Sequence, residues 1–213
     1  MSHPIMIGVL ALQGAFSCHI NMLKKLGIPS IEVRNAEQLH ACDGLIIPGG
    51  ESTTLVRQIA FMNMHDALCE FGKSYPIFGT CAGMILLSEN STSHDVKTLG
   101  LIPMSVQRNA YGRQSESFAA PLIVELPDQE AQTLEAIFIR APKIHEHSSD
   151  VKVLARRGKD PIIVQYKNCL ASSIHPELGE QTFIHEYFAS LVCTNKAERE
   201  ENVKTYTSSP ALT

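Results

Sequence analysis

Short apolar runs alternate with amphipathic segments through the first half of the chain. Residues 5–12 show the pattern of a buried strand, and residues 17–26 follow with helical spacing that ends at Gly27. The alternation continues, with strands predicted over 30–33, 44–47 and 76–79, helices over 52–60, 64–71 and 82–87, and a short helix or loop over 36–42. Ser52 or Thr53 is placed to cap the helix that follows it. Strands separated by helices predict a mostly parallel sheet with helices on both faces.

After Leu99 the hydrophobic period shortens to two residues, which is typical of strands. Strands are predicted over 101–108, 118–126, 136–139, 151–156, 162–166 and 169–174, and we expect them to extend the sheet as antiparallel additions. A last helix is predicted over 180–192. Residues 1–193 are therefore expected to form one α/β domain, and residues 194–213 a polar tail with a charged helical start and a mobile Ser/Thr/Pro end.

Composition narrows the function. The 213 residues are 44% hydrophobic and 19% charged with a net charge of -4, a balance that suits one globular domain. Without a Lys/Arg cluster no nucleic-acid surface is expected, and no apolar stretch predicts a signal peptide or a membrane span. The six cysteines lack the paired spacing of a zinc site or a disulfide scaffold. Reduced thiols favour a cytoplasmic protein.

The strongest chemical signal is Cys81, which lies in the run Gly79-Thr80-Cys81-Ala82-Gly83 directly after a predicted strand. Small residues on both sides permit the tight strand-to-helix turn of a nucleophile elbow, in which the side chain is held at the carboxyl edge of a sheet. The helix that follows points its N-terminal N–H groups toward that position and favours a thiolate. The alternative is a buried structural cysteine beside a packing glycine.

A thiol nucleophile needs a base, and His175 is the best of nine histidines. It ends a predicted strand and opens the run His175-Pro176-Glu177. Residues i and i+2 of an extended strand end point the same way, so Glu177 is expected to orient the imidazole and stabilise its cation. The alternative is an ordinary turn with a solvated glutamate.

A third run, from Pro48 to Thr54, places two glycines after a buried strand. The bare backbone allows a ligand to approach, and the N–H groups of Gly50 and Ala82 are candidates for an oxyanion hole. Glu51 and Ser52 are candidates for holding the ends of a polar substrate. The alternative is a glycine turn followed by a helix cap.

Taken together, six motifs resemble the glutaminase subunit of pyridoxal 5'-phosphate synthase, a family within the class I, triad-type glutamine amidotransferases. The likeness covers about residues 5–192. The motifs are Gly8-Val9-Leu10-Ala11-Leu12-Gln13-Gly14, Pro48-Gly49-Gly50-Glu51-Ser52-Thr53-Thr54, Phe78-Gly79-Thr80-Cys81-Ala82-Gly83, Arg108-Asn109-Ala110-Tyr111-Gly112-Arg113-Gln114, Ile139-Arg140-Ala141-Pro142 and His175-Pro176-Glu177-Leu178.

The resemblance implies a three-layer, flavodoxin-like α/β fold and hydrolysis of L-glutamine to glutamate and ammonia through a cysteine thioester. It implies that ammonia passes to a TIM-barrel synthase subunit in a heteromeric complex for vitamin B6 synthesis, and that no metal or organic cofactor takes part. Carried over by position, the residues and their roles are Cys81 as nucleophile, His175 as general base and acid, Glu177 as its orienter, Gly50, Glu51, Ser52, Arg108, Ile139 and Arg140 around the substrate, and Gln13 near the oxyanion region and the partner interface.

Two departures from the family pattern stand out. Ala110-Tyr111 occupies the place where the family commonly has Ser-Phe, which affects the fine shape of the pocket. The segment 143–150 is also unusual; its His145 and His147 have no third ligand nearby and are expected to be exposed loop residues.

Three other functions remain open on the residues alone. A glutaminase serving histidine, anthranilate or aminodeoxychorismate synthesis would share the triad. A related cysteine hydrolase, peptidase-like or γ-glutamyl-specific, would not release ammonia from free glutamine. A non-catalytic regulatory module would keep every activity in a Cys81→Ala variant.

Overall fold

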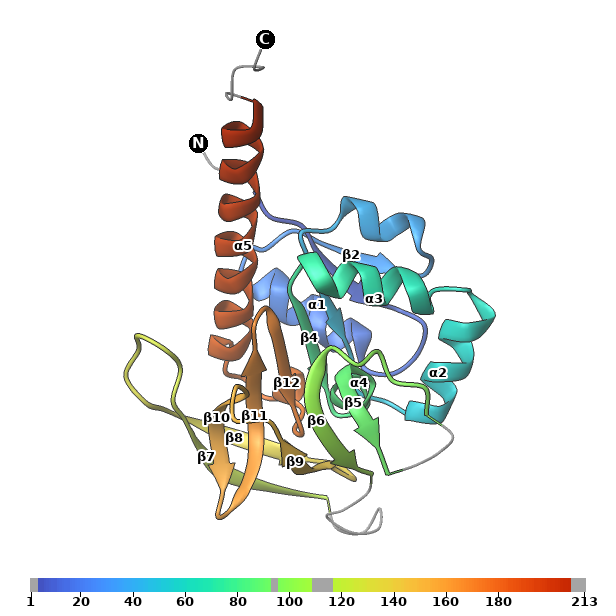
Figure 1. The fold of residues 1–213 in the computed structure, drawn as a ribbon. Helices are drawn as coiled ribbons and strands as arrows, with labels where there is room; N and C mark the ends of the chain where they lie inside the picture. The colour runs from blue at the N-terminus through green and yellow to red at the C-terminus, as the bar shows by residue number, and fades with distance from the viewer. Residues whose placement is uncertain (1–3, 93–95, 109–116, 208–213) are drawn as a thin grey trace.

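The chain folds in three layers, with helices on both faces of a nine-stranded sheet (Figure 1). The computed structural model describes residues 4–92, 96–108 and 117–207, with side chains described as far as residue 203. The Asn109–Gln114 part of the fourth family motif lies outside these residues. The strand order is β2-β1-β3-β4-β12-β11-β10-β7-β8. This confirms the predicted fold class.

The first half of the chain builds the parallel part of the sheet, as its alternating pattern predicts. Strands β2, β1, β3 and β4 are parallel neighbours in that order, and β12 continues them beside β4. The elements are β1 (Ile7–Leu10), α1 (Phe16–Lys25), β2 (Ser30–Val33), the 3-10 helix η1 (Glu37–Ala41), β3 (Gly44–Ile47), α2 (Ser52–Phe61), α3 (His65–Ser74), β4 (Ile77–Thr80) and α4 (Ala82–Leu87).

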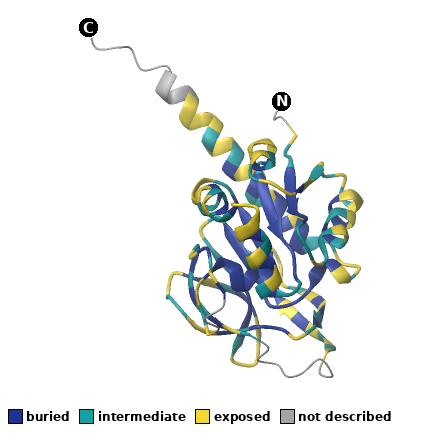
Figure 2. Cartoon of the chain, turned by 90° about the vertical axis from the view of Figure 1, so that its right-hand side faces the viewer, coloured by how far each residue is buried: buried dark blue, intermediate teal, exposed yellow. Residues whose placement is uncertain are grey.

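The two faces of the sheet bury separate groups of side chains because consecutive strand residues point in opposite directions. On β1, Ile7 and Val9 pack with residues of α1 and α5, whereas Leu10 packs with residues of α2, α3 and α4. Figure 2 shows the resulting interior of buried strands beneath helices with exposed outer surfaces. No helix within the described ranges combines the length and the apolar character that crossing a bilayer demands.

The cap of α2 differs from the prediction. The N-cap residue is Glu51, whose side chain accepts a hydrogen bond from the backbone N–H of Thr53 at 3.3 Å, and Ser52 is already the first helical residue. A carboxylate at this position also interacts favourably with the positive end of the helix dipole. Neither Ser52 nor Thr53 is the cap.

The second half of the chain supplies strands of both sheets. Strands β7 (Phe118–Val124), β8 (Gln132–Phe138), β10 (Lys152–Arg157), β11 (Asp160–Tyr166) and β12 (Cys169–Ser172) join the large sheet. All of their pairings are antiparallel except that of β12 with β4, which is parallel. The prediction that every late strand is an antiparallel addition is therefore wrong for β12.

It is also wrong for β6 (Ile102–Gln107), which lies in a separate three-stranded sheet of order β5-β6-β9. Strands β5 (Ser88–Ser91) and β9 (Lys143–His147) were not predicted, because both are short and polar and form a ladder only by pairing with β6. His145 and His147 consequently lie on a strand, and their expected place in a loop is wrong.

The last helix, α5 (Phe183–Thr207), continues well past the predicted end at residue 192. Its extension is tied to the domain by Asp43, whose carboxylate accepts hydrogen bonds from Lys196 at 3.0 Å and Arg199 at 3.3 Å. The Arg199 guanidinium also lies 4.1 Å from the centre of the Tyr75 ring. One continuous helix thus spans the predicted boundary between domain and tail. Beyond these contacts the helix projects from the domain (Figure 1).

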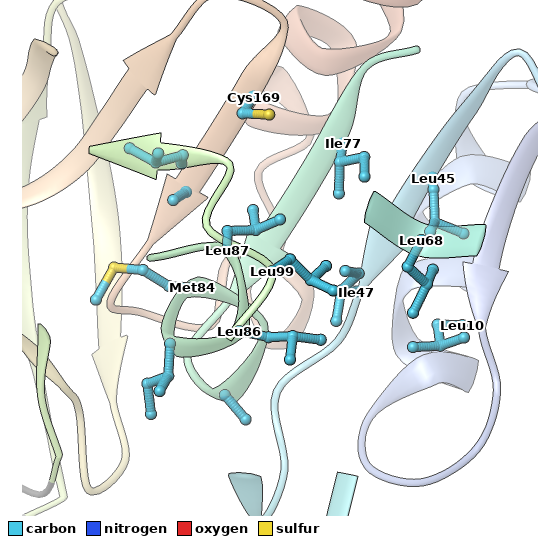
Figure 3. Packing of buried hydrophobic residues seen from close by; sticks show 14 of the residues in the cluster. Leu10, Leu45, Ile47, Leu68, Ile77, Met84, Leu86, Leu87, Leu99 and Cys169 are labelled. Atoms are coloured by element: carbon cyan, nitrogen blue, oxygen red, sulfur yellow. The ribbon is translucent and has the colours of Figure 1, made fainter. Parts of the chain in front are cut away.

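Helix α4 is buried along its whole length, which fixes the position of the residue that precedes it. Its Met84, Leu86 and Leu87 belong to the same hydrophobic cluster as Ile47 of β3 and Leu99 (Figure 3). A short helix clamped on all sides cannot shift without breaking close-packed contacts. The turn between β4 and α4 is accordingly a rigid place for a reactive side chain.

Candidate functional site

Cys81 occupies the turn between β4 and α4 in a backbone conformation that residues other than glycine rarely adopt, with φ 49° and ψ -103°. Its N–H donates to the carbonyl oxygen of Ser172 at 2.8 Å, and its own carbonyl accepts from the N–H of Ile85 at 3.2 Å. Such strain persists only where the surrounding structure determines it, and it is common at active sites. The strand-to-helix turn predicted around Cys81 is present.

The glycines that flank the turn are required by close backbone approach. A Cβ on Gly79 would lie 2.6 Å from the carbonyl oxygen of Gly83, and a Cβ on Gly83 would lie 2.1 Å from that of Ile47. Both distances are shorter than any real contact of a Cβ atom. The small residues of the motif therefore allow α4 to pack directly against β3 and β4.

His175 reaches the same edge of the sheet because of the parallel register of β12 and β4. Thr80, just before Cys81, pairs with Ser172, three residues before His175. The carboxyl ends of parallel neighbours meet at one sheet edge, where α/β proteins bind their ligands. Both Cys81 and His175 line one pocket there, with 7% of each residue exposed.

Gly49 lies against the side chains of both Cys81 and His175, which shows that these two residues are close together. A Cβ built on this glycine would lie 2.3 Å from Cε1 of His175 and 3.2 Å from Cβ of Cys81. One added carbon would therefore touch both residues. The thiol of Cys81 also lies 4.0 Å from the carbonyl oxygen of Ile139, which lines the same pocket.

Glu177 forms the expected pair with His175, but by a different local geometry. The Nδ1 atom of His175 lies 2.7 Å from Oε1 of Glu177, and the carboxylate is buried. Glu177 belongs to the 3-10 helix η3 (Pro176–Leu178), so the expectation of an extended backbone is wrong. Pro176 opens this helix, where its fixed φ and missing N–H are tolerated.

Opposing effects set the charge of this pair. Burial lowers the pKa of His175, but hydrogen bonds and charge interactions with Cys81 and Glu177 outweigh burial and raise its pKa to about 10. Burial raises the pKa of Glu177, yet the imidazoles of His19 and His175 leave it below its ordinary value. The site therefore favours an imidazolium on His175 beside a carboxylate on Glu177.

This charge state predicts a specific dependence of stability on pH. Because the pKa of His175 is about 10 in the fold, against an ordinary 6.5, its protonated ring stabilises the protein fully below pH 6.5. That contribution is lost as the pH rises through about 10. Urea titrations between pH 6.5 and 10 should show a steeper fall in the free energy of unfolding for the wild type than for His175→Gln. Parallel curves for the two proteins would contradict the raised pKa.

The same pocket collects all the residues predicted to contact substrate. Its lining consists of Cys81, His175, Gly50, Glu51, Ser52, Arg108, Ile139, Arg140 and Ile85. Ile85 was missed by the sequence analysis. A signal for it exists, because it lies four residues after Cys81 on a helix and hence on the same face.

Glu51 and two arginines together bring both signs of charge to the pocket. The Glu51 carboxylate lies 2.9 Å from a guanidinium nitrogen of Arg108 and 3.8 Å from one of Arg140. Burial raises the pKa of Glu51, but hydrogen bonds from Thr53 and the two arginines lower it overall. Arg140 has φ 44°, so its side chain is directed by another strained backbone position. A carboxylate beside two guanidinium groups matches a ligand that carries both charges.

The glycine loop is held from two sides by hydrogen bonds to its backbone. The N–H of Gly49 donates to Oγ1 of Thr80 at 3.0 Å, and its carbonyl accepts from the N–H of Ala15 at 3.2 Å. Gln13 packs over the loop, where its Oε1 accepts from the N–H of Glu51 at 3.3 Å. The structure thus places Gln13 beside Gly50.

Ala82, the other candidate oxyanion donor, is the first residue of α4 and is buried. The N–H groups in the first turn of a helix have no acceptor within the helix. The N–H of Ala82 therefore has no carbonyl partner inside α4. Gly50 lines the pocket with Cys81, which immediately precedes Ala82. Gly49, the residue before Gly50, also approaches Cys81, since a Cβ built on it would lie 3.2 Å from Cβ of Cys81.

The fold and site define a class: an α/β protein with a cysteine on a strained strand-to-helix turn, facing a buried His-Glu pair at the carboxyl edge of its parallel strands. The chain belongs to the SNO glutamine amidotransferase family, whose model matches residues 9–194. This confirms the family that the motifs indicate.

Relatives and solved structures agree with this assignment. The chain is 46% identical to "Pyridoxal 5'-phosphate synthase subunit PdxT" of Thermosipho africanus and 44% identical to the protein of that name from Thermotoga maritima, over 87% of this chain and 98% of each relative. A crystal structure of a glutamine amidotransferase matches with 41% identity and a TM-score of 0.81, covering 87% of this chain and 98% of that one. A putative GMP synthase subunit from Thermoplasma acidophilum, 18% identical with a TM-score of 0.64, shares the fold.

Proposed function

We propose that this chain is the glutaminase subunit of a pyridoxal 5'-phosphate synthase. It hydrolyses L-glutamine to L-glutamate and ammonia, and ammonia passes to the synthase subunit for vitamin B6 synthesis. The observation that carries the proposal is the meeting of Cys81 with the buried His175–Glu177 pair around one charged pocket. Family membership and the PdxT relatives support the choice of substrate and pathway.

In the first half of the reaction, the Cys81 thiolate attacks the side-chain amide carbon of glutamine. The N–H groups of Gly50 and Ala82 stabilise the oxyanion of the tetrahedral intermediate, where each donor contributes about 3 kcal/mol. The imidazolium of His175 gives its proton to the departing nitrogen. Ammonia leaves, and a thioester between Cys81 and the glutamyl group remains.

In the second half, neutral His175 takes a proton from water as the water oxygen attacks the thioester carbon. The carbon–sulfur bond breaks, and the new γ-carboxyl group releases its remaining proton to solvent, so the product leaves as glutamate. The thiolate is again paired with the imidazolium. Glu177 holds Nδ1 of the ring throughout, so Nε2 faces the reacting atoms. We assign no metal or organic cofactor to this sequence of steps, since a thiolate and an imidazole suffice for both proton transfers.

The pocket suits a free amino acid because glutamine carries a charge of each sign at its α-carbon. We assign Glu51 to the α-ammonium group, and Arg108 and Arg140 to the α-carboxylate. Ser52 and Ile139, on the same lining, complete the substrate contacts. A peptide-bound glutamine lacks both charges, which distinguishes this function from that of a peptidase-like relative.

Glu51→Gln tests the substrate assignment. The variant keeps the shape of Glu51 and an oxygen that can cap α2, but it removes the carboxylate charge. We expect KM for glutamine to rise about 10- to 100-fold with a much smaller change in kcat, because a charge-assisted hydrogen bond contributes about 1.5–3 kcal/mol. An unchanged KM would remove Glu51 from substrate binding. Glu70→Gln, in an exposed ion pair with Lys73, is the control.

For the partner, we propose a TIM-barrel synthase subunit that forms a heteromeric complex with this chain, with Gln13 near the interface. The position of Gln13 over the Gly49–Gly50 loop supports a role for this residue in activation of the glutaminase by the synthase subunit. We further propose that the protein is cytoplasmic, which the six free cysteines support.

Ammonia release from free glutamine, measured with and without the synthase subunit, tests the function directly. We expect hydrolysis that increases when the synthase is added, and a complex that copurifies. Turnover of a γ-glutamyl peptide without turnover of glutamine would favour the related hydrolase. Activation by the synthase of another pathway would reassign the pathway and keep the chemistry.

A further inference from the structure

Behind the candidate triad lies a buried histidine that the proposed reaction does not use. His19, on α1, is fully buried, and its Nε2 atom lies 3.6 Å from Oε2 of Glu177 and 3.2 Å from Oγ1 of Thr80. Its other ring nitrogen, Nδ1, lies 3.0 Å from Nε2 of His185 on α5. Buried polar groups of this kind are costly unless they are arranged to satisfy one another.

The Glu177 carboxylate needs a second polar neighbour besides His175. Its Oε1 accepts a hydrogen bond from Nδ1 of His175. Its Oε2 is fully buried and has no hydrogen-bond partner among the described residues. An unpaired oxygen of a buried carboxylate is destabilising, because it has lost its water without compensation. At 3.6 Å, Nε2 of His19 is too far for a direct hydrogen bond but close enough for a strong charge–dipole interaction.

The surroundings of His19 determine which of its nitrogens carries the proton. A lone pair at Nε2 would face the carboxylate oxygen and be repelled, so we assign the hydrogen to Nε2. Nδ1 is then an acceptor, and Nε2 of His185 must be the donor to it. This leaves Nδ1 of His185 as a bare acceptor, in agreement with its lack of a partner among the described atoms.

The charge states agree with this assignment. Burial lowers the pKa of His19, although Glu177 acts in the opposite direction and His175 lowers it further. Burial and His19 lower the pKa of His185 to about 3. Both rings are therefore neutral near pH 7, which is the state that the tautomer argument requires.

His19 also connects the carboxylate to the glycine loop. Thr80, which lies 3.2 Å from Nε2 of His19, accepts the hydrogen bond from the N–H of Gly49. One neutral imidazole thus lies between the group that orients His175 and the residue that holds the loop carrying Gly50. No other described element presents a titratable side chain to His19 besides Glu177 on η3, His185 on α5 and, through its charge, His175.

We propose that His19 is a positioning residue of the triad, which presents its Nε2–H to the free oxygen of Glu177 and to Thr80 and so aligns the orienting carboxylate with the glycine loop. The inference rests on the proposed roles of Cys81, His175 and Glu177. Without this N–H the carboxylate loses its counterpart, so the imidazolium of His175 and the thiolate paired with it are both less stabilised.

Two amide substitutions separate this role from simple packing. In His19→Gln the side-chain amide reaches the position of Nε2, whereas in His19→Asn it reaches only that of Nδ1 and faces His185. The full-length chain is treated with iodoacetamide across a range of pH, and alkylation of Cys81 is followed by mass spectrometry. Glutaminase kcat and KM are measured in the complex with the synthase subunit. His19→Leu, which removes both nitrogens, is a second loss variant.

The alkylation midpoint of Cys81 in the wild type is the reference value. In His19→Asn and His19→Leu it should move up by about one pH unit, with kcat reduced about tenfold and KM changed less than about twofold. His19→Gln should restore the wild-type midpoint. Phe71→Leu, in the core beside Tyr75 and away from the site, should lower the melting temperature without moving the midpoint.

Two results would overturn the inference: a wild-type midpoint and kcat in both loss variants, or an equal shift in Phe71→Leu. Failure of His19→Gln to restore the midpoint would also count against it. A different result would affect the proposed function instead. If Cys81 of the wild type is alkylated like an ordinary thiol and no glutaminase activity is found with the synthase, the triad itself is misassigned.

Discussion

Cys81→Ala is expected to reduce glutamine hydrolysis at least about 10⁴-fold, because the thioester cannot form without the sulfur and members of a catalytic triad act as one unit. The fold should persist: alanine bears the same Cβ as cysteine and tolerates the positive φ of this turn no worse. Ammonia release in the complex with the synthase measures the effect. Binding of glutamine by calorimetry should be retained, since Glu51 and the two arginines remain.

Cys193→Ala is the matched control, because Cys193 is exposed on α5. It should leave both activity and binding unchanged. Hydrolysis in Cys81→Ala within about tenfold of the wild type would remove Cys81 from the chemistry, because residual catalysis without a nucleophile is far smaller. Retention of every cellular activity by that variant would favour a non-catalytic module.

Gly49→Ala is expected to lower kcat about 10²-fold or more while leaving most of the stability intact, since misplacing reacting groups by about 1 Å is enough for such a loss. The added carbon would lie 2.3 Å from Cε1 of His175 and 3.2 Å from Cβ of Cys81, so one or both side chains must move. The backbone of Gly49 does not have a positive φ, which means that alanine itself is not strained there.

Gly179→Ala provides the comparison for this prediction. Its added carbon would lie 3.7 Å from the carbonyl oxygen of Pro176, an ordinary contact, and its φ of -87° suits alanine. We expect wild-type kcat for this variant. Equal activities for the two variants, with both folded by circular dichroism, would show that Cys81 and His175 are not as closely placed as the structure has them.

Much of the fold could be predicted because, in the first half of the chain, the local order of apolar and polar residues marks each strand and helix. Strands β2 and β3 and helix α4 occur at the predicted residues, since each is a short apolar run bounded by turn residues or a small-residue motif. Strands β5 and β9 could not be predicted. Their residues are polar, and it is pairing with β6, distant in sequence, that makes them strands.

The candidate reactive groups also came from the sequence, with the elbow around Cys81 and the run His175-Pro176-Glu177 as the two decisive signals. Other residues gave no such signal. His19 is one of nine histidines in the chain, and it lies in a segment with an ordinary amphipathic pattern. Nothing in α1 indicates that the carboxylate of Glu177, far away in the sequence, is its neighbour. Packing of α1 against η3, which carries Glu177, brings the two together.

The sequence by itself determined the class of fold, the family motifs and the candidate nucleophile, because local composition and spacing encode them. Tertiary structure alone decided that the candidate nucleophile and the candidate base meet. The parallel register of β4 and β12 brings Cys81 and His175 to one sheet edge. It also decided the 3-10 turn of Glu177 and the place of His19 behind it, since contacts between distant segments depend on packing that no local pattern records.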